Sequence, residues 1–108
     1  MAMDFLKMMG QAKAMKAAME ELNAEIAETV VEGTSGGGLV KVRLRCKGEM
    51  TGLDIDPSLV RDEDAEVLAD LIMAANNDAR AKADATIAER TTEMMGKFGV
   101  PAGGIPGL

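Results

Sequence analysis

The fold is decided by the segment Gly33–Gly48, which reads GTSGGGLVKVRLRCKG. A glycine-rich turn leads directly into a stretch in which apolar and basic residues alternate. The apolar residues are Val40, Val42, Leu44 and Cys46, and the basic residues are Lys41, Arg43, Arg45 and Lys47. Side chains of a β-strand point alternately to opposite faces. The alternation therefore predicts a strand with one face on a core and the other on water or a charged partner.

The residues on either side predict two further strands of an antiparallel meander. Residues 27–32 are rich in β-branched side chains, which favour a strand. Residues 49–56 alternate again, and we expect Leu53 and Ile55 to face inward. The run Gly36–Gly38 is interpreted as a hairpin turn. A phosphate-binding loop would lead into a helix, whereas here a strand follows.

The basic face of the central strand has two open interpretations. Its cations are free for an anionic partner, or they lie opposite carboxylates of the neighbouring strands and form cross-strand ion pairs. The carboxylates in question are Glu28, Glu32, Asp54 and Asp56. Charge alone does not separate the two.

Residues 4–26 are predicted to form a long amphipathic helix. Its apolar residues recur at intervals of three and four, at Phe5, Met8, Ala12, Met15, Met19, Leu22 and Ile26. This heptad seam is typical of a helix packed against one other helix. At about 30 Å the helix would be longer than a small sheet can cover. We therefore favour a seam between two copies over a core helix within one chain, with candidate interface residues Phe5, Met8, Met15, Met19, Leu22, Val40 and Val42.

A second long helix is predicted over residues 63–95. It is preceded by a helix-start signal at Asp56-Pro57, with Asp56 as the N-cap. Its buried stripe is expected to contain Leu68, Leu71, Ile72, Ala75, Ala79, Ala83 and Ile87. The polar run Asn76–Asp78 is interpreted as a surface or strand-capping feature in preference to a metal site. Residues 1–96 then form a single α+β domain, and the Gly- and Pro-rich residues 97–108 a flexible tail.

The composition narrows the classes of function. The 108 residues carry a net charge of −6 and include no His, Tyr or Trp and one Cys. The usual near-neutral general base is missing, as are the usual zinc ligands. We expect no enzyme activity, no catalytic residue and no metal. No transmembrane segment or signal peptide is expected, and the lone cysteine fits a reducing cytoplasm.

Several segments together resemble the YbaB/EbfC family of bacterial nucleoid-associated proteins. They are MGQAKAM (residues 9–15), GTSGGGLVKV (33–42), IDPSL (55–59), AANNDA (74–79) and the Gly- and Pro-rich tail. The resemblance implies an α-β-β-β-α protomer, with a three-stranded antiparallel sheet flanked by two long helices, in an intertwined homodimer. It also implies duplex DNA as the partner with little sequence preference, a role in nucleoid organisation and gene expression, and no cofactor.

Charge supplies candidate DNA contacts, because the family has no short motif for them. We infer Lys7, Lys13, Lys16, Lys41, Arg43, Arg45 and Lys47, with Arg80, Lys82 and Arg90 as further cations. Residues 1–47 carry seven cations and six acids, whereas residues 48–108 carry five and twelve, so any DNA surface must be local. The near-absence of aromatic residues disfavours single-strand binding by stacking. The alternative is a scaffold dimer that contacts other proteins through its acidic helix face and apolar tail.

Overall fold

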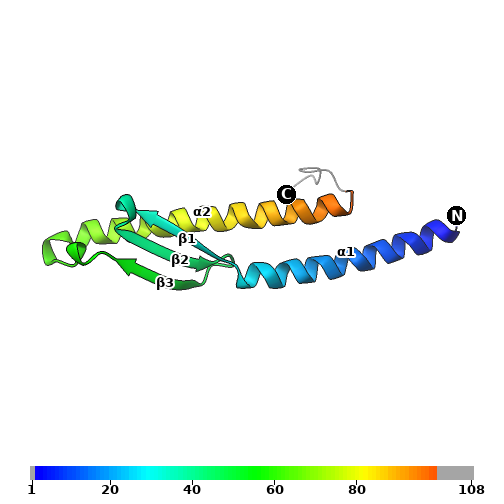
Figure 1. Cartoon of the computed structure of the whole chain (residues 1–108), viewed down its shortest axis with the longest axis horizontal. Helices are drawn as coiled ribbons and strands as arrows, with labels where there is room; N and C mark the ends of the chain where they lie inside the picture. The colour runs from blue at the N-terminus through cyan, green and yellow to red at the C-terminus, as the bar shows by residue number, and fades with distance from the viewer. Residues whose placement is uncertain (1, 100–108) are drawn as a thin grey trace. The chain divides into compact units, whose positions relative to one another are not determined.

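The computed structural model describes residues 2–99, which form two long helices and a small sheet (Figure 1). In chain order they are α1 (Ala2–Glu28), β1 (Val30–Ser35), β2 (Val40–Arg45), β3 (Met50–Ile55) and α2 (Ala65–Lys97). Short 3-10 turns are η1 (Gly36–Gly38), η2 (Pro57–Leu59) and η3 (Asp62–Asp64). This order confirms the predicted α+β class. The tail expected over residues 97–108 lies mostly on residues 100–108, outside the described part of the chain, and Lys97 belongs to α2 instead.

Some element boundaries differ from those predicted. Strand β1 begins at Val30 and not at residue 27, because α1 continues to Glu28. The turn η1 is the expected hairpin turn, and its three glycines have φ values of 60°, 69° and 98°. Residues with a side chain rarely adopt such values, so this turn requires glycine. Asp56 is the N-cap of η2, as predicted, and accepts a hydrogen bond from the Ser58 N–H at 2.9 Å.

The contacts within the chain define two compact units. The sheet unit is Ile26–Ile87, and the helical unit is Met1–Glu25 with Ala88–Leu108. Both α1 and α2 contribute to each unit. The single domain expected over residues 1–96 stays a prediction.

The core of the sheet unit lies between the sheet and α2. The strands follow the order β1-β2-β3 and are antiparallel, which confirms the meander. Val40 and Val42 are completely buried, together with Ala75 and Ala79 of α2. The two valines were expected at a dimer interface. Their burial is complete inside one chain and requires no second copy.

Gly33 allows the backbone of β1 to lie directly on the backbone of α2. A Cβ atom built on Gly33 would lie 2.7 Å from the Cα of Ala79, and still closer to the Ala75 carbonyl oxygen and the Ala79 nitrogen. Such distances do not occur between real atoms, and backbone cannot move aside as a flexible side chain can. Any side chain at position 33 would push the helix away from the strand.

Side chains of α2 satisfy the outer edge of β1. Asp78 Oδ2 accepts a hydrogen bond from the Thr34 N–H at 2.9 Å, and Lys82 Nζ donates to the Glu32 carbonyl oxygen at 3.0 Å. Asp78 and Lys82 also form an ion pair with each other at 3.1 Å. Asp78 therefore has the strand-capping role favoured from the sequence. An edge strand covered in this way is a poor template for pairing with other chains.

Leu53 faces inward, as predicted, but a single chain does not bury it. Leu53 pairs in register with the buried Val42 and so lies on the same face of the sheet, but it remains 41% exposed. The physical reason is that α2 packs against β1 and β2 and leaves the middle of β3 uncovered.

We predict that Gly33→Ala lowers the free energy of unfolding by about 3 kcal/mol, because the new methyl group overlaps the backbone of α2. Urea unfolding followed by circular dichroism measures the change. The matched control is Gly10→Ala in α1, where an added Cβ has no neighbour within 4 Å. There alanine should stabilise the helix by about 1 kcal/mol. Equal effects of the two substitutions would contradict the close approach.

Candidate nucleic-acid interface

The basic residues of β2 lie on the face of the sheet that points away from α2, among acids of both neighbouring strands. In register, Arg43 lies opposite Glu32 of β1 and Gly52 of β3, and Lys41 lies opposite Asp54. This arrangement brings positive and negative side chains together on the same face, as expected if the cations of the central strand form cross-strand ion pairs.

Arg43 is held by two carboxylates. Its Nη1 atom lies 2.8 Å from Oδ2 of Asp54 and 3.5 Å from Oε1 of Glu32. Its guanidinium rests on Gly52, where an added Cβ would lie 2.6 Å from Nε. The hydrogen bond between Arg43 and Asp54 raises the pKa of Arg43 and lowers the pKa of Asp54, and the charge of Lys41 lowers the pKa of Asp54 further.

Arg45 is also paired, by a contact that the sequence analysis missed. Its Nη1 atom lies 2.7 Å from Oε2 of Glu49, across the turn between β2 and β3. The available signal was an acid four residues after the arginine, beyond a Gly-containing turn. Of the four cations predicted on this strand, only Lys41 and Lys47 form no ion pair within residues 2–99.

The lysines of α1 are free of such pairs. Lys7, Lys13 and Lys16 are all exposed in the helical unit, and none forms an ion pair with a described residue. Each therefore presents its charge to solvent or to an anionic partner. They form the largest group of unpaired cations on one element in the described part of the chain.

The apolar seam of α1 is open at its N-terminal end. Phe5 is 64% exposed and Met8 67%, Met19 is 37% exposed, Met15 is half-buried, and Leu22 is buried. Large apolar side chains exposed along one helix mark a surface for a partner. The single chain thus leaves Phe5 and Met8 uncovered, whereas it already buries Leu22 at the other end of the seam.

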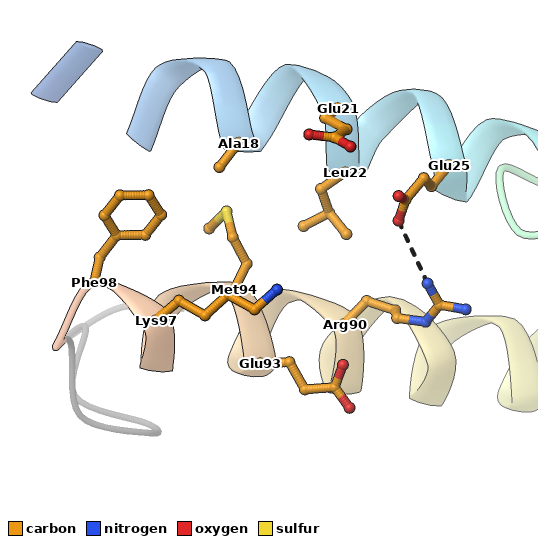
Figure 2. A pocket seen from close by; sticks show the side chains of 9 residues that line it. All are labelled: Ala18, Glu21, Leu22, Glu25, Arg90, Glu93, Met94, Lys97 and Phe98. Carbon is orange, nitrogen blue, oxygen red and sulfur yellow. Dashed lines mark hydrogen bonds and ion pairs between the residues drawn. The ribbon is translucent and has the colours of Figure 1, made fainter. Parts of the chain in front are cut away.

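A groove of about 330 Å³ lies in the helical unit, between α1 and the C-terminal end of α2 (Figure 2). Leu22, Met94 and Phe98 point into it, and an ion pair of 3.5 Å joins Glu25 to Arg90. Its lining also contains the charged residues Glu21, Glu93 and Lys97. With three carboxylates against two cations, the groove is unsuited to an anionic ligand.

The cations of α2 differ in their surroundings. Lys82 is engaged at the edge of β1, and Arg90 is engaged by Glu25. Arg80 is exposed and forms no ion pair with the residues that the structure describes. Two of the three further cations inferred from the sequence therefore have structural roles.

The described residues present neither a cluster suited to a metal ion nor a membrane-spanning helix. Residues 2–99 contain no group of three or more His, Cys, Asp or Glu side chains placed to hold a metal. No helix among them is both long and apolar enough to cross a bilayer.

A small α+β protein with unpaired lysines along one helix and an uncovered apolar seam has the features of a binding protein. Residues 1–98 match the model of the YbaB/EbfC DNA-binding family, and the chain belongs to that family. This confirms the resemblance inferred from the sequence. The family is one of DNA-binding proteins and not of enzymes.

Relatives and a solved structure support the assignment over most of the chain. A nucleoid-associated protein of Rhizobium meliloti (strain 1021) is 51% identical over 100 residues, which cover 93% of this chain and 94% of that protein. One from Bradyrhizobium sp. (strain ORS 278) is 47% identical over the same shares. The crystal structure of an uncharacterized protein from Helicobacter pylori is 30% identical, with a TM-score of 0.70, and covers 84% of this chain and 96% of that one.

We predict that Arg43→Gln raises the pKa of Asp54 towards its ordinary value, because the hydrogen bond and the charge that stabilise the carboxylate are lost. An NMR titration of the side-chain carboxyl carbon measures it. In the wild type the pKa of Asp54 is lower in the folded than in the unfolded state. The ion pair therefore contributes stability above the unfolded pKa of about 3.9, and that contribution is lost as the pH falls through the folded pKa.

The control for this titration is Arg61→Gln. Arg61 is paired with Glu63 and Asp64, so its loss should leave Asp54 unchanged. An Asp54 pKa that does not respond to Arg43→Gln would show that the ion pair is not formed in solution.

Proposed function

We propose that this protein binds duplex DNA as a homodimer, through contacts to the phosphate backbone and with little sequence preference. In this way it contributes to nucleoid organisation and gene expression in the cytoplasm. The observation that carries the proposal is the set of unpaired lysines on α1, Lys7, Lys13 and Lys16, in a member of a DNA-binding family.

The chemistry of the unpaired cations favours contact with phosphate. Lysine is a compact charge that binds phosphate without reading a base edge. Aromatic residues make up 2% of the chain, so platforms for stacking bases are nearly absent. Because the net charge is −6, attraction to DNA must come from a local concentration of cations, and a dimer would present each of them twice.

Two apolar surfaces support the homodimer. One is the exposed seam of α1, whose three-and-four spacing suits a second α1 helix. The other is β3 in the sheet unit, where Met50 is 44% and Leu53 41% exposed. Leu53 lies on the core-facing side of the sheet, where a second chain would bury its exposed part. Burying both surfaces would remove from water several of the large apolar side chains that the described chain leaves exposed.

The alternative function is that of a scaffold dimer that binds other proteins. The groove in Figure 2 favours it, because acidic and apolar side chains of both helices line that groove. The apolar tail that would assist lies outside the described residues. Truncation after Lys97 separates the two functions in a pull-down. The scaffold loses its protein partners with unchanged DNA affinity, whereas the DNA-binding protein requires no such partners.

We predict a steep dependence of DNA affinity on salt. If three lysines per protomer contact phosphate, they should contribute about −5 to the slope of log K against log salt in a dimer. Fluorescence anisotropy with random duplex DNA measures it, and neutralising Lys7, Lys13 and Lys16 together should remove most of this contribution. Unrelated duplex sequences should bind with similar affinity. A protein with no detectable affinity at low salt would refute the proposal.

We predict that Met8→Glu shifts the protein from dimer to monomer, because each chain would place a carboxylate in an apolar seam. Sedimentation equilibrium measures the mass, and circular dichroism checks that the helices persist. The matched control is Ala17→Glu, an exposed position on the opposite side of α1, which should leave the dimer intact. A dimer equally stable in both variants would place the interface elsewhere.

A further inference from the structure

Most cations of the sheet unit are already paired with acids of the same unit. Arg43 is paired with Asp54 and Glu32, and Arg45 with Glu49. Arg61 and Lys82 also have carboxylate partners. The cations of Ile26–Ile87 without an ion pair to a described residue are Lys41, Lys47 and Arg80. Lys41 lies opposite Asp54 in register and is partly neutralised by it.

The two remaining cations meet at the turn between β2 and β3. Lys47, Gly48 and Arg80 line the same hollow of about 30 Å³, with Leu44, Cys46, Ala83 and Asp84. Gly48 has a φ of 111°, and a Cβ atom built on it would lie 3.9 Å from Nη1 of Arg80. The guanidinium of Arg80, on α2, therefore lies beside the turn. Two cations 33 residues apart in the sequence are brought to one place by the packing of α2 on the sheet.

We propose that Lys47 and Arg80 form a phosphate-binding clamp, which we call the hairpin clamp. It would be a second contact with the backbone of duplex DNA, besides the lysines of α1, and it rests on the proposed DNA-binding function. A guanidinium presents several N–H donors in a plane and can bind two phosphate oxygens at once, while the ammonium of Lys47 supplies a second charge.

The size of the hollow decides the kind of anion. At about 30 Å³ it has room for little more than water, so it does not enclose a metabolite. A ligand must approach from outside and present its anionic group at the mouth. A phosphate of the nucleic-acid backbone does this, because it is exposed on the surface of the duplex.

Two acids close to the clamp affect it in different ways. Glu49 follows the turn, but its charge is neutralised by Arg45 at 2.7 Å. Asp84 lies one helical turn after Arg80, lines the hollow and forms no ion pair with a residue of the described chain. Asp84 therefore opposes the approach of a phosphate. Its removal should strengthen DNA binding, an effect opposite in sign to the loss of either cation.

The experiment measures the affinity of the full chain for random duplex DNA by fluorescence anisotropy over a range of salt. Arg80→Gln and Lys47→Gln should each weaken binding about tenfold at low salt, because each removes a charge-assisted contact. In a dimer each should also make the salt slope about 1.8 less steep, since two phosphate contacts are lost. The control Arg61→Gln removes the same charge from a paired arginine elsewhere in the sheet unit and should leave both values unchanged.

Asp84→Asn removes an acid and not a cation, so the clamp predicts a change in DNA affinity of opposite sign. The substitution should tighten binding severalfold, whereas Asp70→Asn, an equal change at an exposed position on α2, should have a smaller effect.

The failure of the clamp can be told apart from the failure of the proposed function. If the wild type does not bind duplex DNA, both are wrong. If the wild type binds, but Arg80→Gln and Lys47→Gln behave like Arg61→Gln, and Asp84→Asn like Asp70→Asn, the hairpin clamp alone is overturned. Circular dichroism confirms that each variant is folded before its affinity is compared.

Discussion

The sheet unit depends on the contact of two backbones, those of β1 at Gly33 and of α2 at Ala75 and Ala79. Because no side chain separates them, α2 lies close enough to β1 for Asp78 and Lys82 to bond the peptide groups of its edge. The same closeness buries Val40 and Val42 completely. Three small residues thus set the distance between the layers, and the longer side chains of the core and of the edge are arranged around that distance.

This packing also decides which charges are free. Acids of the sheet lie beside the basic strand, and Arg43 and Arg45 form ion pairs with them. Among the described residues, cations without an ion pair remain along α1 and beside the turn at Gly48. In a protein with a net charge of −6, the position of such cations matters more for binding than their number. Because the chain belongs to a DNA-binding family, these unpaired cations are the candidate contacts with DNA.

The apolar surface left exposed has a related explanation. One helix against a three-stranded sheet covers β1 and β2, and Leu53 of β3 is left partly in water. In the helical unit, Leu22 is buried while Phe5 and Met8, further towards the N-terminus, are not. The described residues of a single chain leave both surfaces partly in water. A homodimer would meet this need with two identical copies of the same surfaces.

The sequence by itself determined the elements and their order, because these depend on local patterns. Alternation defined β2, the three-and-four spacing defined α1, and Asp56-Pro57 defined the start of η2. Two of the acids that pair with the basic strand, Glu32 and Asp54, could also be named from the sequence. Only the tertiary structure decided that Gly33 contacts α2, that Leu53 stays exposed and that Arg80 lies beside Gly48. Each of these depends on strand register or on where α2 crosses the sheet, and both are set by the packing of residues far apart in the chain, which no local pattern records.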